Sequence, residues 1–117
     1  MSKSVIVIED EFLIAEDFIA MCTEIGLEVL GNASDSEEAE RLIRDKQPDY
    51  VLMDVRIKGK TDGVEVARKI YDVLPDIKFI FVTGSNEQST IDRINTDHPY
   101  AILAKPVSFE KLRDTFN

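Results

Sequence analysis

Several short apolar runs in this sequence end in residues whose side chains could do chemistry together. These residues are Glu9 and Asp10 after residues 5–8, Asp54 after residues 50–53, Thr83 after residues 79–82 and Lys105 after residues 101–104. If the runs are parallel strands of one sheet, their C-terminal ends share an edge, and α/β proteins bind ligands at that edge. The edge would carry three carboxylates, one hydroxyl and one ammonium group. We therefore expect these side chains to converge on one site.

The chemistry that such a set favours is phosphoryl transfer to a carboxylate beside a hard cation. Several oxygen ligands at a water-accessible site suit Mg²⁺, and an aspartate can attack a phosphoryl group to give an aspartyl phosphate. This transfer is catalysed mainly by positioning and by neutralising the phosphoryl oxygens. The metal, Lys105 and the Thr83 hydroxyl could each meet one of those oxygens. Asp54 would need no general base, because an aspartate side chain is ordinarily ionised near neutral pH.

Taken one at a time, these residues have simpler explanations. The carboxylates of Glu9–Glu11 could begin a helix, whose N-terminus favours negative charge, although like charges about 5 Å apart in a partly screened site repel by about 3 kcal/mol. Asp54 could be a turn residue, and Lys105 could be a solvated loop lysine. Their shared position at strand ends favours a site, with Glu11 assigned to the first turn of a helix.

The elements that would position these residues alternate along the chain. Apolar runs without polar alternation indicate strands covered on both faces, as in parallel sheets joined by right-handed crossover helices. The expected strands are Val5–Ile8, Leu27–Ala33, Tyr50–Met53, Phe79–Val82 and Ala101–Ala104. The expected helices are Glu11–Ile25, a segment from Ser34 to Pro48, a segment from Val64 to Pro75, Glu87–Asn95, and a last helix with Phe109, Leu112 and Phe116 as its apolar stripe. The pattern predicts an α/β fold, a doubly wound (βα)5 sandwich.

Local signals indicate where some of these helices begin and end. Gly26 stands where a C-cap glycine would end the first helix, and Ser34 with Glu37 has the spacing of a capping box for the second. The segment Glu87–Asn95 is mostly polar and anchored chiefly by Ile91 and Ile94, so we expect a short, loosely held helix.

Length, composition and charge limit the classes of protein to which this chain could belong. The 117 residues fit one domain, 1–117, and the net charge of −9 disfavours nucleic-acid binding. The apolar runs are too short to cross a bilayer and no leader opens the chain, which favours a cytoplasmic protein. Cys22 cannot form an internal disulfide. His98 is the single histidine, so a catalytic triad or zinc cluster has little support.

The sequence resembles the receiver domain of two-component response regulators over essentially its whole length. The matching motifs, in chain order, are Glu9-Asp10, Asp54, Thr83-Gly84 and Lys105-Pro106. The resemblance implies a flavodoxin-like receiver fold with strand order 2-1-3-4-5. It also implies that Asp54 is the phosphoacceptor and that Thr83 and Lys105 contact the phosphoryl group.

The resemblance also implies a metal site and a particular backbone geometry. Mg²⁺, or Mn²⁺ in its place, would be held by Asp10 and Asp54, with Glu9 in support and the backbone carbonyl of Arg56 as a further ligand. The peptide bond between Lys105 and Pro106 is expected to be cis.

Several positions depart from the usual receiver pattern or tune it. Receivers commonly carry Tyr or Phe where this chain has Ile102, and Tyr100 is expected on the same strand face as Ile102. Either Tyr100 replaces the missing switch aromatic, or the segment after Thr83 carries the change. Arg56 and Ser85 occupy the positions that flank the phosphoryl group. The stretch from Phe81 to Gly84 is similar to an alphaproteobacterial-type receiver subgroup with a Phe-x-Thr-Gly motif.

The partners implied are a sensor histidine kinase or a histidine phosphotransfer protein as donor, and an unknown output partner. The output partner is expected on the face formed by the fourth helix, fifth strand and fifth helix, with no nucleic acid and no membrane involved. No output domain follows Asn117, so we expect a stand-alone receiver.

We expect that the protein is not an enzyme, although it assists its own phosphorylation and dephosphorylation. The loop Lys58-Gly59-Lys60 is expected to be solvated, or to draw a phosphodonor toward Asp54.

Three other functions compete with this one. A degenerate receiver would bind partners without phosphorylation, an interpretation that Ile102 keeps open. A phosphatase of the haloacid dehalogenase type needs a second aspartate where this chain has Arg56. A flavodoxin-like mononucleotide binder needs a Ser/Thr/Gly-rich phosphate loop, and Glu9–Glu11 would repel that phosphate.

Overall fold

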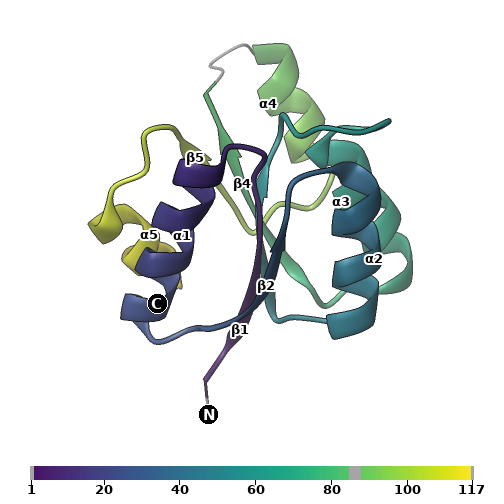
Figure 1. The fold of residues 1–117 in the computed structure, drawn as a ribbon. Helices are drawn as coiled ribbons and strands as arrows, with labels where there is room; N and C mark the ends of the chain where they lie inside the picture. Colours follow the sequence, from purple (N-terminus) through teal and green to yellow (C-terminus); the bar gives the residue numbers. More distant parts are fainter. Residues whose placement is uncertain (1, 85–87, 117) are drawn as a thin grey trace.

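One parallel sheet organises the chain, and the computed structural model describes residues 2–84 and 88–116 of it. The strands are Ser4–Ile8 (β1), Glu28–Ala33 (β2), Tyr50–Asp54 (β3), Lys78–Thr83 (β4) and Ala101–Ala104 (β5). The helices are Phe12–Ile25 (α1), Ser36–Lys46 (α2), Gly63–Val73 (α3), Gln88–Asn95 (α4) and Phe109–Phe116 (α5). The strand order is β2-β1-β3-β4-β5 (Figure 1). The predicted fold class and strand order are confirmed.

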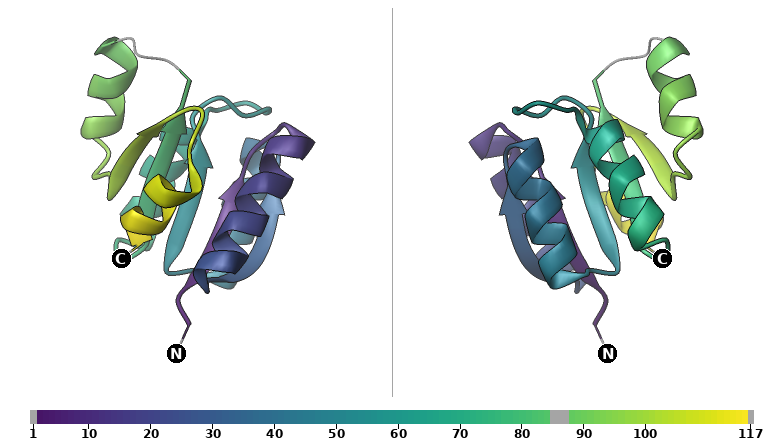
Figure 2. Two further views of the ribbon diagram at one scale, coloured as in Figure 1. Left: turned by 90° about the vertical axis from the view of Figure 1, so that its left-hand side faces the viewer. Right: turned by 90° about the vertical axis from the view of Figure 1, so that its right-hand side faces the viewer.

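Helices cover both faces of the sheet, which explains why its strands are apolar at successive positions. α1 and α5 lie on one side, and α2 and α3 lie on the other (Figures 1 and 2). Alternate residues of β3 divide between two cores: Leu52 packs with Phe18 of α1 and Leu112 of α5, whereas Met53 packs with Ile70 of α3 and Ile94 of α4. Side chains of this size stabilise by roughly 1.5–3 kcal/mol each when fully buried.

The residue that caps α1 was predicted correctly from the sequence, whereas the residue that caps α2 was not. Gly26 ends α1 with a φ of 104°, in the left-handed region, and its N–H donates to the carbonyl of Thr23, so the predicted C-cap is confirmed. The capping box expected from Ser34 is wrong. The N-cap of α2 is Asp35, whose side chain accepts a hydrogen bond from the Glu38 N–H at 2.8 Å. The Glu37 carboxylate has other partners, described below.

Tyr100 lies just outside β5, and its surroundings differ from those expected. Its ring meets Tyr50 edge-on at a centroid distance of 5.6 Å, and Tyr50 in turn meets Phe116 of α5 at 4.8 Å. Ile102 packs instead against the core on the α2 and α3 side. The expectation that Tyr100 and Ile102 share one face is therefore wrong, because the strand alternation begins only at Ala101.

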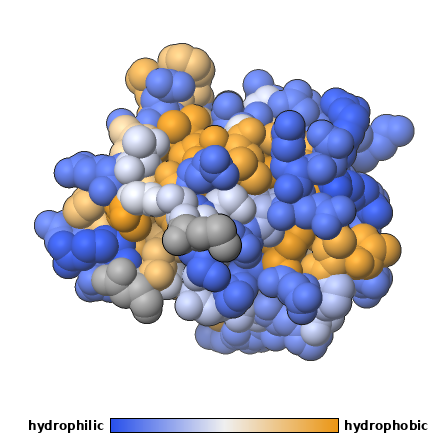
Figure 3. All heavy atoms as spheres, turned by 90° about the horizontal axis from the view of Figure 1, so that it is seen from below, coloured by the Kyte–Doolittle hydropathy of each residue, from blue (hydrophilic) through white to orange (hydrophobic). Residues whose placement is uncertain are grey.

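The end of the sheet where the strands begin faces downward in Figure 1. Figure 3 shows this end of the molecule as largely hydrophilic, interrupted by separate hydrophobic patches. Within residues 2–84 and 88–116, no helix has the length and apolar character that crossing a membrane requires. The C-terminal ends of the strands, at the top of Figure 1, are where the predicted chemistry lies.

Candidate functional site

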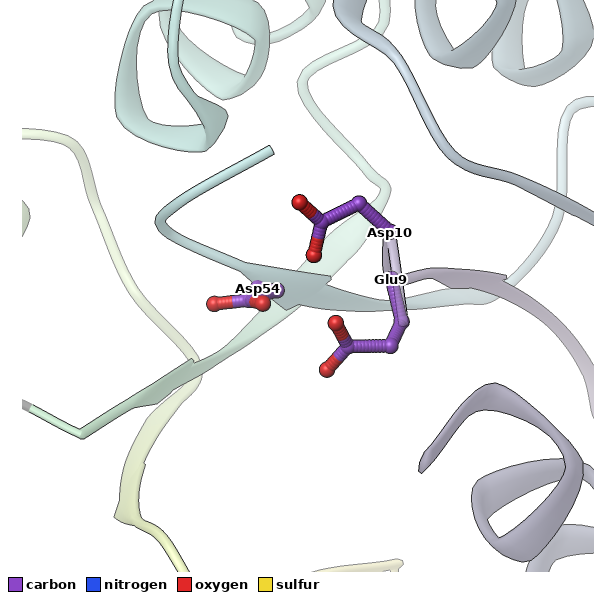
Figure 4. Close-up of side chains that lie close together, drawn as sticks. All are labelled: Glu9, Asp10 and Asp54. Atoms are coloured by element: carbon purple, nitrogen blue, oxygen red, sulfur yellow. The ribbon is translucent and has the colours of Figure 1, made fainter. Parts of the chain in front are cut away.

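Backbone pairing along the sheet brings the predicted site residues together. The Glu9 N–H donates to the Ala33 carbonyl at 3.0 Å, and the Lys105 N–H donates to the Thr83 carbonyl at 3.0 Å. These bonds extend the parallel ladders one step beyond β1 and β5, so residues just past each strand stay in register at the sheet edge. Figure 4 shows Glu9, Asp10 and Asp54 gathered at this edge.

Glu9, Asp10 and Asp54 form an acidic cluster. One oxygen of each carboxylate lies within 4.8 Å of the others; Glu9 and Asp54 are buried, whereas Asp10 is half-buried. Burial raises the pKa of the Asp10 carboxyl, and the hydrogen bond and negative charge of Glu9 raise it further. Three carboxylate oxygens at this spacing, one of them reached by water, suit a hard divalent cation such as Mg²⁺. The donor set therefore fits the metal that the sequence implies.

Lys105 supplies a positive charge inside this cluster. Its Nζ lies 3.1 Å from Glu9 Oε1 and 3.0 Å from Asp54 Oδ2. Burial alone would lower the pKa of the Lys105 ammonium group, but hydrogen bonds and charges from Asp54 and Glu9 outweigh it, so the pKa is raised. The second Glu9 oxygen accepts the Glu11 N–H at 3.1 Å. Glu9 thus has protein partners on both oxygens while it stands beside Asp10.

The loop between β3 and α3 holds the other side of Asp54. The Arg56 N–H donates to Asp54 Oδ1 at 3.1 Å, and the Gly63 N–H donates to the Val55 carbonyl at 2.9 Å. A Cβ on Gly63 would lie 2.9 Å from Met53 Cγ and 3.2 Å from the Asp54 carbonyl carbon. Only glycine allows the start of α3 to approach the end of β3 this closely.

The remaining predicted site residues are placed as follows. Thr83 is buried at the end of β4, and Gly84 is exposed directly after it. The Lys105–Pro106 peptide is cis. Ser85 lies outside the described residues. Tyr100 lies far from the cluster, because its N–H donates to the Phe79 carbonyl at the opposite end of β4 from Thr83, about 13 Å away along the strand.

Two residues near the site were not singled out from the sequence. Ser36 and Glu37, in the first turn of α2, hydrogen-bond to the loop that carries Arg56. The sequence indicates Glu37 only as part of a capping box, and no sequence signal marks Ser36. The glycine of Lys58-Gly59-Lys60 was the available signal, since its φ of 110° marks a close approach of the backbone. Lys58, Gly59 and Lys60 are exposed, as expected for a solvated loop, and the loop is in addition hydrogen-bonded to α2.

The fold and the site together define a flavodoxin-like α/β protein with a carboxylate and lysine site at the C-terminal sheet edge. The chain belongs to the response regulator receiver domain family, whose model matches residues 5–117.

Named relatives agree with this assignment. The transcriptional regulatory protein PdtaR of Mycobacterium tuberculosis is 32% identical over 112 residues, which are 94% of this chain and 53% of that protein. The response regulator GacA of Pseudomonas aeruginosa is 33% identical over 109 residues, 92% of this chain and 50% of that protein. The chain therefore spans about half the length of these curated relatives.

A solved structure shows the same architecture. The signal receiver domain of a modulated diguanylate cyclase from Desulfovibrio desulfuricans superposes with a TM-score of 0.91 at 32% identity. The match covers 99% of this chain and 91% of that one.

Proposed function

We propose that this chain accepts a phosphoryl group on Asp54 from a histidine kinase or a histidine phosphotransfer protein, and that phosphorylation changes how it binds a partner. The observation that carries the proposal is the contact of Lys105 Nζ with both Asp54 and Glu9, beside Asp10, at the edge of a receiver sheet. In this proposal the chain is a phosphoacceptor that assists its own phosphorylation and dephosphorylation, and not an enzyme.

The proposed transfer uses groups already in place. An Asp54 oxygen attacks the phosphorus of a phosphorylated imidazole, so an O–P bond forms and the N–P bond breaks. The electron pair of that bond stays with the imidazole, which takes up a proton. Lys105 then pairs with a phosphoryl oxygen, and the Thr83 hydroxyl meets another. Arg56 keeps its backbone hydrogen bond to Asp54 Oδ1 during the attack.

Mg²⁺, or Mn²⁺ in its place, would be held by the carboxylates of Asp10 and Asp54, with Glu9 in support and the Arg56 carbonyl as a further ligand. The ion would neutralise charge on the phosphoryl oxygens. Asp10 is half-buried and therefore open to a hydrated ion, whereas the buried Glu9 is committed to Lys105. This division supports Asp10 as a direct ligand.

The proposed switch lies around Thr83 and α4. Ile102 pairs with Phe81 in the β4–β5 ladder and packs in the same core as Ile94 of α4. An inward pull on Thr83 would therefore reach α4 through packing that involves no switch aromatic. The short α4 would carry the change, consistent with membership of the Phe-x-Thr-Gly subgroup. The output partner would bind the face formed by α4, β5 and α5.

The start of α1 offers the donor a place to dock. Phe12 is 73% exposed and Leu13 is 76% exposed, directly after the acidic residues of the site. An apolar groove lies between α1 and the loop after β5. Its lining includes Ile14, Phe18, Met21, Pro106 and Val107. A donor that buried these side chains would bring its phosphorylated histidine to Asp54.

Intact mass spectrometry tests the proposal. Incubation with acetyl phosphate and Mg²⁺ should add one phosphoryl mass to the wild-type chain and none to Asp54→Ala, and omission of Mg²⁺ should prevent the gain. Absence of the added mass in the wild-type chain would favour a degenerate receiver that binds partners without phosphorylation. An equal gain in Asp54→Ala would move the acceptor to another residue.

A further inference from the structure

The loop between β3 and α3 is fastened to the first turn of α2. The Ser36 N–H donates to the Lys58 carbonyl at 2.8 Å, and residues 35 and 58 form an isolated parallel bridge. The Lys60 N–H donates to Glu37 Oε1 at 3.3 Å, and the Thr61 N–H donates to Ser36 Oγ at 3.4 Å. The Ser36 hydroxyl also donates to Glu37 Oε2. We call Ser36 and Glu37, with these bonds, the loop clamp.

The loop clamp is closely packed. Ser36 is 2% exposed, so its hydroxyl is a buried polar group satisfied from within the clamp. Gly59 adopts a φ of 110°, and a Cβ there would lie 2.9 Å from the Ser36 backbone nitrogen and collide with the Ser36 and Glu37 side chains. The Ser36 hydroxyl also lowers the pKa of the Glu37 carboxyl, which keeps this acceptor ionised. In Figure 1 the loop passes above the N-terminal end of α2.

We propose that Ser36 and Glu37 are positioning residues for the phosphoacceptor site, which they serve by fixing the loop that carries Arg56. This inference rests on the proposed function, in which the Arg56 carbonyl is a metal ligand. The Arg56 N–H already holds Asp54 Oδ1 at 3.1 Å. The clamp joins the same loop two to five residues later, at Lys58, Lys60 and Thr61. Loosening it would leave Arg56 to be ordered when the metal binds.

Metal affinity is the property that should report this role. Ordering a loosened loop costs conformational entropy at the moment of binding, and second partners of ligating groups commonly affect metal affinity. We expect Glu37→Ala and Ser36→Ala to raise the dissociation constant for Mg²⁺ about fivefold. By reciprocity, Mg²⁺ should slow amide hydrogen exchange at the Ser36 N–H, which lies on the clamp and not on the metal.

Isothermal titration with Mg²⁺, without any phosphodonor, measures the effect directly. Glu38→Ala is the matched control, because it removes the same charge from the same turn of α2 and leaves the clamp intact. Glu37→Gln keeps an oxygen that can accept the Lys60 N–H, and should bind Mg²⁺ within about twofold of the wild type. Circular dichroism confirms that each variant is folded; Glu37 is exposed, so its variants remain testable if Ser36→Ala does not fold.

Two results would overturn the proposal: a folded Glu37→Ala that binds Mg²⁺ as tightly as the wild type, or an equal loss in Glu38→Ala, which would mean that charge alone is responsible. Failure of the proposed function is a separate result. A wild-type chain that binds Mg²⁺ but gains no phosphoryl group would refute phosphorylation of Asp54 and leave the role of the loop clamp supported or refuted by the titrations.

Discussion

Lys105 makes it possible for two buried carboxylates to lie at one strand edge. The Glu9 side chain is fully buried and that of Asp54 is 5% exposed, so the buried charge of each needs a compensating partner. Lys105 is far away in the sequence from both, and it reaches them because the parallel sheet places the ends of β1, β3 and β5 on one edge. The same ammonium group is also where the proposed function needs a counter-charge for phosphate.

Replacing Lys105 by methionine tests this electrostatic role. Lys105→Met should lower the free energy of unfolding by about 3 kcal/mol, because it leaves buried carboxylates without their cation. Added Mg²⁺ should restore part of the loss by supplying positive charge at the same cluster. Urea unfolding with and without Mg²⁺ measures both effects, with the exposed Lys111→Met of α5 as the control. A variant as stable as the wild type would contradict the role given to Lys105.

Asp97, after α4, is a buried carboxylate outside the site, and it predicts a pH dependence of stability. Burial raises its pKa to about 6 despite Arg68 and His98, which lower it, while Asp72 adds to the rise. Arg68 Nε lies 3.6 Å from Oδ1, and among the described residues Oδ2 has no hydrogen-bond partner. Between the ordinary pKa of 3.8 and about 6, the folded state holds a proton that the unfolded state has released. Stability from this group therefore falls as the pH rises through that window.

The corresponding measurement compares wild type with Asp97→Asn at pH 4.5 and pH 7.5. Relative to the variant, the wild type should lose about 2 kcal/mol of unfolding free energy between these values, since each pKa unit corresponds to about 1.4 kcal/mol. Taking the difference removes the contributions of the other titrating groups. Asp76→Asn, at an exposed position, should show no such change. A constant difference between wild type and Asp97→Asn would mean that Asp97 is ionised throughout.

At the scale of elements, boundaries decided by a single residue were predictable. Gly26 ends α1 because its backbone conformation suits glycine, and residues 101–104 form β5 as expected. The start of α2 was not predictable, because Ser34, Asp35 and Ser36 can all cap a helix. The choice between them is made by the loop after β3, whose contacts with α2 no local pattern encodes.

The surroundings of Tyr100, just before β5, were likewise not predictable from local sequence, and they support a prediction. Because Tyr100 packs on Tyr50 about 13 Å along the strand from Thr83, Tyr100→Ala should affect stability more than phosphorylation. We expect a loss of about 1 kcal/mol in unfolding free energy and an unchanged rate of Asp54 phosphorylation by acetyl phosphate. Tyr100→Phe, which keeps the ring, should recover most of the stability. A large fall in the phosphorylation rate would instead make Tyr100 part of the switch.

For the whole molecule, topology made the site residues predictable from the sequence. A parallel sheet gathers the residues that follow its strands, so Asp10, Asp54, Thr83 and Lys105 could be identified from position alone. Lys105 could also be predicted as the counter-charge to the acidic strand end, but its individual hydrogen bonds could not. That Glu9 pairs with Lys105 depends on side-chain packing between segments far apart in the chain.

The arrangement of the whole molecule also predicts that two kinds of phosphodonor will respond differently to changes in α1. Phe12 and Leu13 are exposed beside the site and do not form it, so the double substitution Phe12→Ala, Leu13→Ala should preserve the helix, since alanine is a strong helix former. Transfer from a phosphorylated histidine kinase that is active on the wild type should fall about tenfold, equivalent to about 1.4 kcal/mol of lost docking energy. Phosphorylation by acetyl phosphate should stay within about twofold, because a small donor needs no docking face.

Single-turnover transfer rates measured with both donors show whether the double substitution removes a docking face or disturbs the phosphoacceptor site. Val73→Ala is the control, because it truncates an exposed apolar side chain at the far end of α3. If the double substitution slows both donors equally, α1 supports the geometry of the site and is no docking face. If it slows neither, the kinase reaches Asp54 from another side, and the exposure of Phe12 and Leu13 requires a different partner.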